Sequence, residues 1–381
     1  MGDLVVGVPS DHDQSERKPV NEAPIRFLSV SPGVWGAERS LLTLAESLHA
    51  AGHRVSLYCV SAELGEAWRG RVNAAVVVVA SAESGGVSGR LRQLVRFFRA
   101  RGVLPKTGTV VSFSPRLNAP VAVLSLFDRV RRAPRRWFID LHDYLDAGKG
   151  LVALDAAVIA GAGVVAVSEF AASVSRAVSA RATVLYRPIV PRSAPLTEPP
   201  RSERMVLRIG IVGRIDPDKN HVLLADAIAN SGLPCDLVVR GVPTEYGHPS
   251  GDLVLDAMRR AVGDQLKYEG PVANELAMDG LDVLVVANER EPLGRTVLEA
   301  QLAGLPVVVP DKGGAAELVV DGVTGLYFIA NSSVSLGAVL SALAHSADLR
   351  AALAIAGRAS ATFQSDPIRY AHAYASALGR G

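Results

Sequence analysis

The chain has 381 residues, 49% of them hydrophobic, which is enough to build the cores of two ordinary domains. Its 40 basic and 38 acidic residues leave a formal net charge of +2, so the composition gives no sign of a nucleic-acid or acidic-polymer partner. The two cysteines, Cys59 and Cys235, lie far apart in apolar segments, which argues against a disulfide framework and favours a reducing cytoplasm.

Two further classes of protein are disfavoured by the sequence. It has no run of about 20 apolar residues, the length that a membrane-spanning helix needs. The first 24 residues lack the basic start and apolar centre of a secretory signal, and we expect them to form a disordered lead-in. These features predict a cytoplasmic protein.

A strand and helix alternation begins after this lead-in. The apolar run 25–31 ends in a Pro-Gly turn, 37–53 has the period of an amphipathic helix, and 54–61 is the next strand, which makes a βαβ unit. Further strands are expected at 74–80, 109–114 and 136–142, and further helices at 91–102 and 169–180. This order predicts a parallel sheet with helices on both faces.

A second alternation follows a break in the pattern. Residues 188–204 hold five prolines and no apolar period, which marks a linker. After it, strands are expected at 206–214, 235–241, 281–287 and 306–310, and helices at 220–230, 252–262, 295–304 and near 314–320. Two such α/β halves predict a ligand cleft at the carboxyl ends of their strands.

The pattern divides the chain into five parts. We expect a lead-in at 1–24, an N-terminal domain at 25–187, the linker at 188–204, a C-terminal domain at 205–360, and a last helix at 361–381. This last helix is a candidate for packing back on the N-terminal domain.

The segment EPLGRTVLEA, residues 291–300, resembles an anion site at a helix start. Its Pro and Gly predict a tight turn that a ligand can approach closely. The N–H groups of the next three residues should then lack intrahelical partners, and a pyrophosphate would satisfy them. Pro292, Leu293 and Gly294 lie in the turn, and the three N–H groups are those of Arg295, Thr296 and Val297.

The same segment places one acid on each side of the turn. Glu299 lies one turn into the helix, where it can accept hydrogen bonds from vicinal hydroxyls such as those of a ribose. Glu291 precedes the turn and faces the side where a sugar attached to the phosphate would lie. The alternative is an ordinary strand-to-helix turn with two solvated acids.

Two cations flank a proline turn in VGRIDPDKN. Arg214 ends a strand and Lys219 enters a helix, the arrangement that a departing pyrophosphate needs as it gains charge. The alternative is a pair of surface cations. Asp216 and Asp218 form a D-x-D pattern, but the adjoining Lys219 and the lack of a second acidic or histidine cluster in the sequence argue against a metal site.

The N-terminal half offers weaker signals. Gly36 belongs to a glycine-bearing turn, SPGVWGAERS, that enters a helix and would let a phosphate or acceptor approach the backbone. His142 and Asp143 follow a strand, so they point at the expected cleft, where the histidine could orient the reacting sugar or share a proton; the alternative is a polar pair that starts a helix. In DKGGAAELV, Gly313 and Gly314 are expected to lie over the ligand or to form a plain tight turn.

Taken in order, these motifs resemble a known family. WGAER, LHD, VSEF, VGRIDPDKN, EGPV and EREPLGRTVLEAQLAGLPVVVPDKGGAAELVVDGVTGLYF together resemble the retaining glycosyltransferases of family four, over about residues 26–330. The resemblance implies the GT-B fold, an α/β architecture of two Rossmann-like domains whose parallel sheets face each other across a cleft. It also implies sugar transfer from a nucleotide-diphosphate sugar, with no metal and no further cofactor.

The resemblance also assigns roles to individual residues. Glu291 would contact the donor sugar and Glu299 the nucleotide ribose, while Arg214 and Lys219 would stabilise the leaving diphosphate. His142 would be the active-site histidine of the N-terminal domain. The remaining donor-binding positions would be Gly36, Gly213, Pro292, Leu293, Gly294, Arg295 and Thr296.

Two positions depart from the family pattern. The usual double glycine before Ala-Glu-Arg is Trp35-Gly36 here, which makes that loop bulkier. The frequent Asn before the linker is Arg187. Neither change touches the two acids or the two cations.

Two basic segments lie in the half expected to bind the acceptor. Residues 90–102 and 129–137 hold five Arg each, mixed with apolar residues. They suggest a surface for anionic lipids or a lipid-linked acceptor, which would place the protein at the inner membrane face. The alternatives are a solvated helix with its two Phe packed inside, and an anionic soluble acceptor.

We therefore expect a transferase that moves a sugar to a hydroxyl of a small-molecule, oligosaccharide or lipid-linked acceptor. A nucleotide-sugar epimerase on the same fold is one alternative, and it would form product without an acceptor. A non-catalytic sugar-nucleotide-binding partner is another, and it would be indifferent to changes at Glu291.

Overall fold

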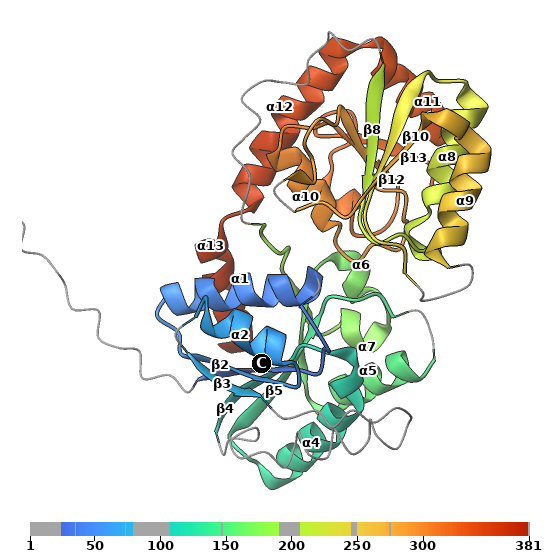
Figure 1. The fold of residues 1–381 in the computed structure, drawn as a ribbon. Coiled ribbons are helices and arrows are strands. Elements are labelled where there is room, and N and C mark those ends of the chain that lie inside the picture. Colours follow the sequence, from blue (N-terminus) through green and yellow to red (C-terminus); the bar gives the residue numbers. More distant parts are fainter. Residues whose placement is uncertain are drawn as a thin grey trace, which may run out of the picture.

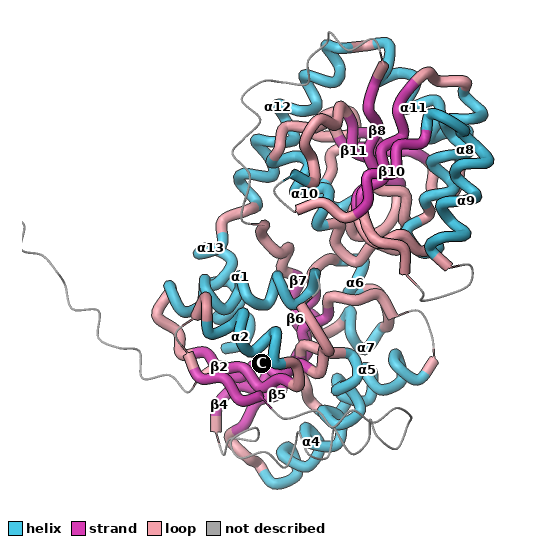
Figure 2. The backbone as a smooth tube through the Cα atoms, viewed as in Figure 1, coloured by secondary structure: helices cyan, strands magenta, loops and turns pink. Residues whose placement is uncertain are grey.

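The computed structural model describes residues 24–34, 36–72, 74–78, 107–145, 148–189, 206–244, 250–273 and 276–379. The expected helix at 91–102, the basic segment 90–102, Trp35 and most of the expected linker and lead-in lie outside these residues. Within them, the chain forms two parallel sheets, each with helices around it (Figures 1 and 2). The predicted α/β fold of two sheet-based halves is confirmed.

The N-terminal sheet runs from Ile25 to Val184. Its strands are β1 (Ile25–Ser29), β2 (Val55–Cys59), β3 (Ala75–Val78), β4 (Gly108–Ser112), β5 (Arg135–Leu141), β6 (Gly163–Ala166) and β7 (Ala182–Val184). They lie in the order β3-β2-β1-β4-β5-β6-β7 and all pair in parallel. The connecting helices are α1 (Gly36–Ala50), α2 (Ala62–Arg69), α4 (Asn118–Arg131), α5 (Lys149–Ala160), α6 (Glu169–Ala172) and α7 (Arg176–Ser179).

The C-terminal sheet repeats this plan. Its strands are β8 (Leu207–Val212), β9 (Cys235–Arg240), β10 (Leu266–Gly270), β11 (Val283–Val285), β12 (Val307–Pro310) and β13 (Leu326–Phe328), in the order β10-β9-β8-β11-β12-β13. Its helices are α8 (His221–Ser231), α9 (Gly251–Val262), α10 (Arg295–Leu302), α11 (Ser333–His345) and α12 (Ala347–Gln364). Every strand pair is again parallel.

The N-terminal sheet is buried on both faces, because neighbouring side chains of a strand point in opposite directions. Phe27 packs in one apolar cluster with Leu41 of α1. Its neighbour Leu28 packs in another cluster with Val121 of α4 and Leu154 of α5. Helices α1 and α2 therefore cover one face of this sheet, and α4 and α5 cover the other (Figure 1).

The last helix, α13 (Pro367–Gly379), returns to the N-terminal domain. It packs against α1 (Figure 1). The Tyr374 side chain is fully buried, with its ring centre 6.3 Å from that of Phe27. The preceding helix α12 packs against α10 in the C-terminal domain. Helices α12 and α13 therefore link the two domains a second time.

Four local expectations differ from the structure. The expected helix at 169–180 is two short helices, α6 and α7, because the Ser175 hydroxyl accepts a hydrogen bond from the Val178 amide and starts a new helix. The expected helix near 314–320 is one 3-10 turn at Ala316–Leu318. Helices α2 and α4 were not predicted; in α4, exposed apolar residues such as Val123 and Val130 hide the helical period.

Among the described residues, no single helix is long and apolar enough to cross a membrane. Helices α11 and α12 meet the length and composition criteria only as a pair, and the chain bends by 102° between them.

A buried histidine starts the first helix of the C-terminal domain. His221 is 1% exposed, so its ring has lost the water that would stabilise a charge. This burial, together with the nearby charge of Lys219, lowers the pKa of His221 from 6.5 to about 4. The histidine is therefore neutral in the folded protein at pH 7.

This burial predicts a loss of stability in mild acid. Between pH 6.5 and 4 the unfolded chain binds a proton at this position and the folded chain does not, so acidification favours unfolding by up to about 3 kcal/mol. His221→Leu removes the titrating group, and its free energy of unfolding should fall less steeply across this pH window than that of the wild type. Denaturant unfolding measured at intervals from pH 7.5 to 4 checks this; parallel curves would show that His221 does not couple to folding.

Candidate active site

The carboxyl ends of both sheets meet at the domain interface. Ser168 follows β6 in the N-terminal sheet, and its hydroxyl donates a hydrogen bond to the carbonyl of Pro292, which follows β11. The Arg295 guanidinium, at the start of α10, donates to the hydroxyl of Ser40 in α1. The EPLG turn is therefore in direct contact with the N-terminal domain.

An acid and a cation from separate motifs meet at this interface. Lys219 Nζ lies 2.5 Å from Glu291 Oε2, although 72 residues separate them in the chain. The Asn288 side-chain amide also donates to Glu291 Oε2, at 3.3 Å. Both charged side chains are largely covered, with 26% of the lysine and 17% of the glutamate exposed. The pair is therefore a site where positive and negative charge are held together at a half-buried position.

The position of Lys219 is set by Asp216. The Asp216 carboxylate caps the 3-10 turn Pro217–Lys219 by accepting from the Lys219 amide at 3.1 Å. Asp216 also lies 3.0 Å from the Arg214 guanidinium. The first acid of the D-x-D pattern thus shapes the cation loop, and the described residues contain no group of three or more His, Cys, Asp or Glu side chains placed to hold a metal ion.

Arg214 is placed differently from Lys219. Its side chain is 53% exposed, and its ion pair is with Asp216 and not with Glu291. Gly213 before it has a positive φ of 144°, and Gly241 packs directly on its carbonyl, where a Cβ would lie 1.7 Å from the oxygen. Backbone packing thus accounts for Gly241, and Gly213 provides the turn after β8.

The glycine pair 313–314 supports the EPLG turn from the backbone side. The Gly314 amide donates to the Glu291 carbonyl at 2.8 Å. A Cβ on Gly314 would lie 2.1 Å from the Pro292 carbonyl oxygen, and one on Gly313 would lie 2.3 Å from that of Glu289. Neither position accepts a larger residue, so packing of one loop on another explains this pair.

The start of α10 differs in one detail from expectation. Gly294 has a φ of +86° and caps the helix without a side-chain hydrogen bond. The Val297 amide, expected to be free, donates to the Gly294 carbonyl at 2.9 Å because the first turn is tightened. The predicted set of three open amides is therefore wrong at Val297.

The second acid of the motif lies one turn further along α10. Glu299 Oε1 is 3.3 Å from the Arg295 guanidinium, the spacing of an i, i+4 ion pair. Thr296 is partly exposed on the same helix, and Leu293 is buried. On the opposite side of the interface, Gly36 is the first residue of α1, with open space where a Cβ would lie.

His142 lies just after the strand that neighbours β6 in the N-terminal sheet. It follows β5, which pairs with β6, the strand that leads to Ser168. Its ring stacks on Phe113, with ring centres 4.4 Å apart, and its Nδ1 is 3.1 Å from Asp140. Within the part of the chain that the structure describes, His142 makes no hydrogen bond or ion pair with Glu291; its Nε2 lies 4.0 Å from Oδ2 of Asp143, whose side chain is half exposed.

Arg187, noted above as a departure, has a structural partner. Its buried guanidinium donates to Asp140 Oδ1 and lies 4.8 Å from the centre of the Phe113 ring. Burial alone would raise the pKa of Asp140, but the charge of Arg187 and the hydrogen bond with His142 hold it below its ordinary value. Asp140 is therefore an anion in the interior of the N-terminal domain.

Glu317 is a contact residue that sequence reasoning did not find. Its carboxylate reaches from the C-terminal domain to the amides of Glu169 and Phe170, at 2.8 and 2.6 Å, and caps the start of α6. The Tyr186 hydroxyl also donates to it at 2.9 Å. The local signal for Glu317 is an acid just after the glycine pair, but its partners lie 131 to 148 residues away in the chain.

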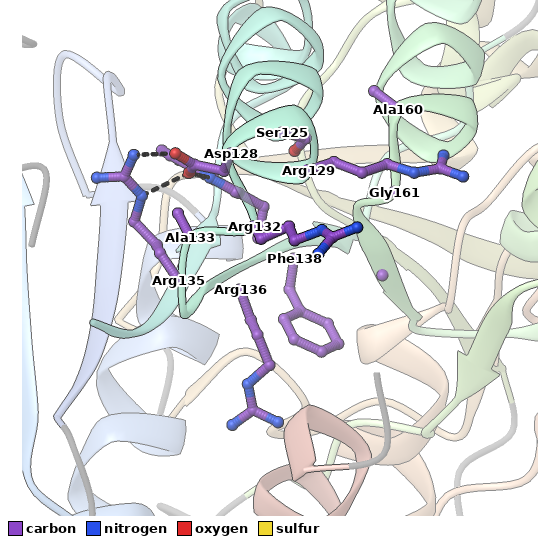
Figure 3. A pocket seen from close by; sticks show the side chains of 12 residues that line it. Ser125, Asp128, Arg129, Arg132, Ala133, Arg135, Arg136, Phe138, Ala160 and Gly161 are labelled. Carbon is purple, nitrogen blue, oxygen red and sulfur yellow. Dashed lines mark hydrogen bonds and ion pairs between the residues drawn. The ribbon is translucent and has the colours of Figure 1, made fainter. Parts of the chain in front are cut away.

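A separate hollow lies away from the interface. It is formed by the end of α4, the amino ends of β5 and β6 and the end of α5 (Figure 3). Several arginines line it, and one of them, Arg135, pairs with Asp128 at 2.5 Å. Trp137 also donates to Asp128 at 2.7 Å, so part of the basic segment 129–137 serves the internal packing of the domain. The residues that line it include none of the interface acids and cations described above.

Known proteins resemble this chain in sequence and in fold. Residues 200–360 match the family model "Glycosyl transferases group 1". The D-inositol 3-phosphate glycosyltransferase of Rhodococcus erythropolis is 35% identical over 127 residues, which cover 31% of this chain and 29% of that protein. The GDP-mannose-dependent alpha-mannosyltransferase of Mycobacterium tuberculosis is 31% identical over 198 residues, 51% of this chain and 47% of that protein. The chain thus spans less than half the length of these curated relatives.

The fold comparison covers nearly the whole chain. The crystal structure of Anabaena HepE in complex with UDP-glucose superposes with a TM-score of 0.74, over 94% of this chain and all of that one, at 21% sequence identity. Residues 200–360 therefore carry the sequence pattern of the group 1 glycosyl transferases, on a chain whose fold is that of the GT-B glycosyltransferases.

Proposed function

We propose that this protein transfers a sugar from a nucleotide-diphosphate sugar to a hydroxyl of a small-molecule, oligosaccharide or lipid-linked acceptor. The observation that carries the proposal is the contact of Lys219 with Glu291 at the domain interface, next to the start of α10. An anion-binding group, a carboxylate and a helix start lie within one loop cluster. A site for a sugar diphosphate needs a cation and helix amides for the phosphates and a carboxylate for the sugar hydroxyls.

The donor would lie on the C-terminal domain. Its diphosphate would bind to Lys219, Arg214 and the first amides of α10, which provide positive charge as the phosphate departs. Because Lys219 already has an anionic partner in Glu291, the donor phosphate would share that cation and leave the carboxylate free to meet the sugar. Glu299 would then accept hydrogen bonds from the ribose hydroxyls.

The acceptor would come from the N-terminal domain, on the side of His142. We propose that the reaction retains the anomeric configuration and that the leaving phosphate takes the proton of the acceptor hydroxyl. We also propose that the cations make a metal ion unnecessary, since Lys219 and Arg214 supply the charge that a metal would otherwise give. The inter-domain bonds from Ser168 and Glu317 would keep the two substrates together and limit reaction with water.

The basic surface of the N-terminal domain supports a further part of the proposal. Helix α4 exposes Val123, Leu126, Phe127 and Val130 on its outer side, with exposed fractions of 48% to 76%. Arg129, Arg131 and Arg132 are exposed next to them. Exposed apolar residues between arginines are typical of a helix that rests on an anionic membrane surface. We propose that α4 makes such a peripheral contact.

Substituting the two acids of the EPLG segment one at a time should have different effects on turnover and on nucleotide binding. Glu291→Ala should lower the release of nucleotide from a sugar donor by about 10²-fold or more while the nucleotide affinity stays within a few-fold, because this acid faces the sugar. Glu299→Ala should weaken nucleotide binding itself. Calorimetry with UDP, GDP, dTDP and ADP, followed by turnover of the matching sugar nucleotides, separates the two effects.

Each variant serves as the control for the other, since both remove one carboxylate from the same motif. Retained turnover in Glu291→Ala would remove its assigned role. No binding of any of the four nucleotides to the wild type would contradict the donor site.

Loss of Glu317 should loosen the domain interface. Two charge-assisted bonds to backbone amides contribute about 1.5–3 kcal/mol each, so Glu317→Ala should lower the ratio of closed to open molecules at least tenfold. Small-angle scattering should then give a larger radius of gyration, and turnover should fall. Asp311→Ala is a matched control, because the Asp311 carboxylate bonds to Ala330 within the C-terminal domain. Equal scattering from both variants would show that Glu317 does not hold the domains together.

The membrane contact can be tested with vesicles. Val130→Glu places a negative charge at the most exposed apolar position of α4, where it should reduce the fraction of protein that floats with vesicles of anionic phosphatidylglycerol. Val334→Glu, at an equally exposed position of α11, should leave that fraction unchanged. If wild-type protein floats equally with neutral and anionic vesicles, or not at all, the proposed contact is wrong.

A further inference from the structure

A buried carboxylate connects three distant parts of the chain. Asp140 lies near the end of β5 and is 4% exposed. Its Oδ1 accepts from the Arg187 guanidinium and lies 3.1 Å from His142 Nδ1. Its Oδ2 accepts from the Tyr374 hydroxyl of α13 at 2.9 Å. Strand β5, the segment after β7 and the last helix therefore meet at one acid.

The charge of Asp140 decides which ring nitrogen of His142 carries the hydrogen. Arg187 is always a cation and is in direct contact with Asp140, so the carboxylate remains ionised and can only accept hydrogen bonds. The His142 nitrogen that faces it must then carry the hydrogen. In the neutral ring this leaves Nε2, at the other end of the imidazole, as a hydrogen-bond acceptor.

The plane of the His142 ring is also fixed. Its face stacks on Phe113, with an angle of 26° between the rings. The Arg187 guanidinium lies 4.8 Å from the centre of the same Phe113 ring, so one aromatic side chain contacts two of the three partners of Asp140. The histidine side chain is only 7% exposed. It is thus held by a hydrogen bond at one nitrogen and by packing over its face.

Tyr374 brings the end of the chain into this arrangement. Helix α13 carries it, and α12 before it packs on α10, the helix that bears Glu299. The contact of α12 is close: a Cβ on Gly357 would lie 2.9 Å from the Thr324 carbonyl and 3.2 Å from the Gln301 side chain of α10. Helices α12 and α13 therefore extend from α10 to Asp140, the acid that contacts His142.

We propose that Asp140 is a positioning residue for His142, and that Tyr374 makes helix α13 part of the support of this histidine. Arg187 keeps the acid charged, Asp140 selects the Nδ1–H form of the ring, and Tyr374 fixes the second oxygen of the carboxylate. His142 Nε2 then accepts a hydrogen bond from a substrate hydroxyl. The last step rests on the proposed sugar transfer; the Nδ1–H form and its dependence on Tyr374 do not.

The test uses variants that remove one hydroxyl from the same helix. Tyr374→Phe removes the hydrogen bond to Asp140 and keeps the ring. Tyr370→Phe is the comparison on the same helix, because the buried Tyr370 hydroxyl, one turn earlier on α13, interacts with Arg187 and makes no hydrogen bond to Asp140. Both changes delete a buried oxygen, so a general effect on helix packing would appear in both.

Two readouts are taken on the full chain. Long-range proton–nitrogen NMR spectra, with the His142 signals identified by their absence in His142→Gln, report which ring nitrogen carries the hydrogen. We expect the Nδ1–H form in the wild type and in Tyr370→Phe, and a shift of the His142 nitrogen signals in Tyr374→Phe. We also expect kcat to fall about 10-fold in Tyr374→Phe, the size typical of a partner behind a functional histidine, with nucleotide affinity unchanged.

The outcomes separate this inference from the proposed function. An Nε2–H form in the wild type, or identical His142 signals in all three proteins, would overturn the inference whether or not the protein transfers sugar. The expected NMR result in a protein without transferase activity would leave the positioning role intact and refute the proposed function. Equal losses of kcat in both tyrosine variants would show that the hydrogen bond from Tyr374 to Asp140 has no specific role, which would overturn the part of the inference that concerns Tyr374.

Discussion

The segment from Asn288 to Gly294 is the constraint on which the site depends, because it is held from three directions by contacts that leave no freedom to its backbone. Gly313 and Gly314 pack against its carbonyl groups, the Ser168 hydroxyl bonds to it from the N-terminal domain, and Lys219 holds its acid. Any one of these contacts would place part of the loop. Together they fix the direction of Glu291 and the start of α10 before a ligand arrives, which reduces the entropy that binding must overcome.

The charges at the interface are arranged so that each functional group already has a partner. Lys219 faces Glu291 and Arg295 faces Glu299, while the buried pair of Asp140 and Arg187 lies inside the N-terminal domain. Paired charges at half-buried positions avoid the cost of an isolated buried ion. A ligand with phosphates and hydroxyls would therefore exchange partners within an existing network. This arrangement suits a site that must accept a highly charged substrate and release a more highly charged product.

Much of the fold followed from local patterns, because strands buried on both faces are apolar throughout and the turns between them contain Gly and Pro. The turns that carry the two acids and Lys219 also followed from the sequence, since their spacing is local, whereas the roles of these three residues stay predictions. Helix α4 was missed because its exposed apolar side chains, such as Val130, erase the helical period. The helix at 169–180 was expected as one element because a serine such as Ser175 can either cap a new helix or lie inside a continuous one, and the sequence does not distinguish the two.

The missing parts of the site have a common physical cause. Glu317 binds amides almost 150 residues away, and Asp140 binds a hydroxyl 234 residues away. No local pattern marks such partners, because only the tertiary fold brings them together. Arg187 was noted as a departure from the family pattern. The structure explains it by its ion pair with Asp140, which no sequence spacing predicts.

The packing of α13 on the first sheet has a consequence for how the chain acquires its structure. Phe27, in β1, is covered in part by Tyr374, so part of one face of the N-terminal core remains open to water until α13 has been synthesised. A ribosome completes the whole C-terminal domain before that happens. The usual order, in which the first domain folds while the second is still being made, cannot finish here. The N-terminal sheet is therefore completed only after the C-terminal one, and the part of its apolar face that α13 covers is a surface that cellular chaperones would meet during synthesis.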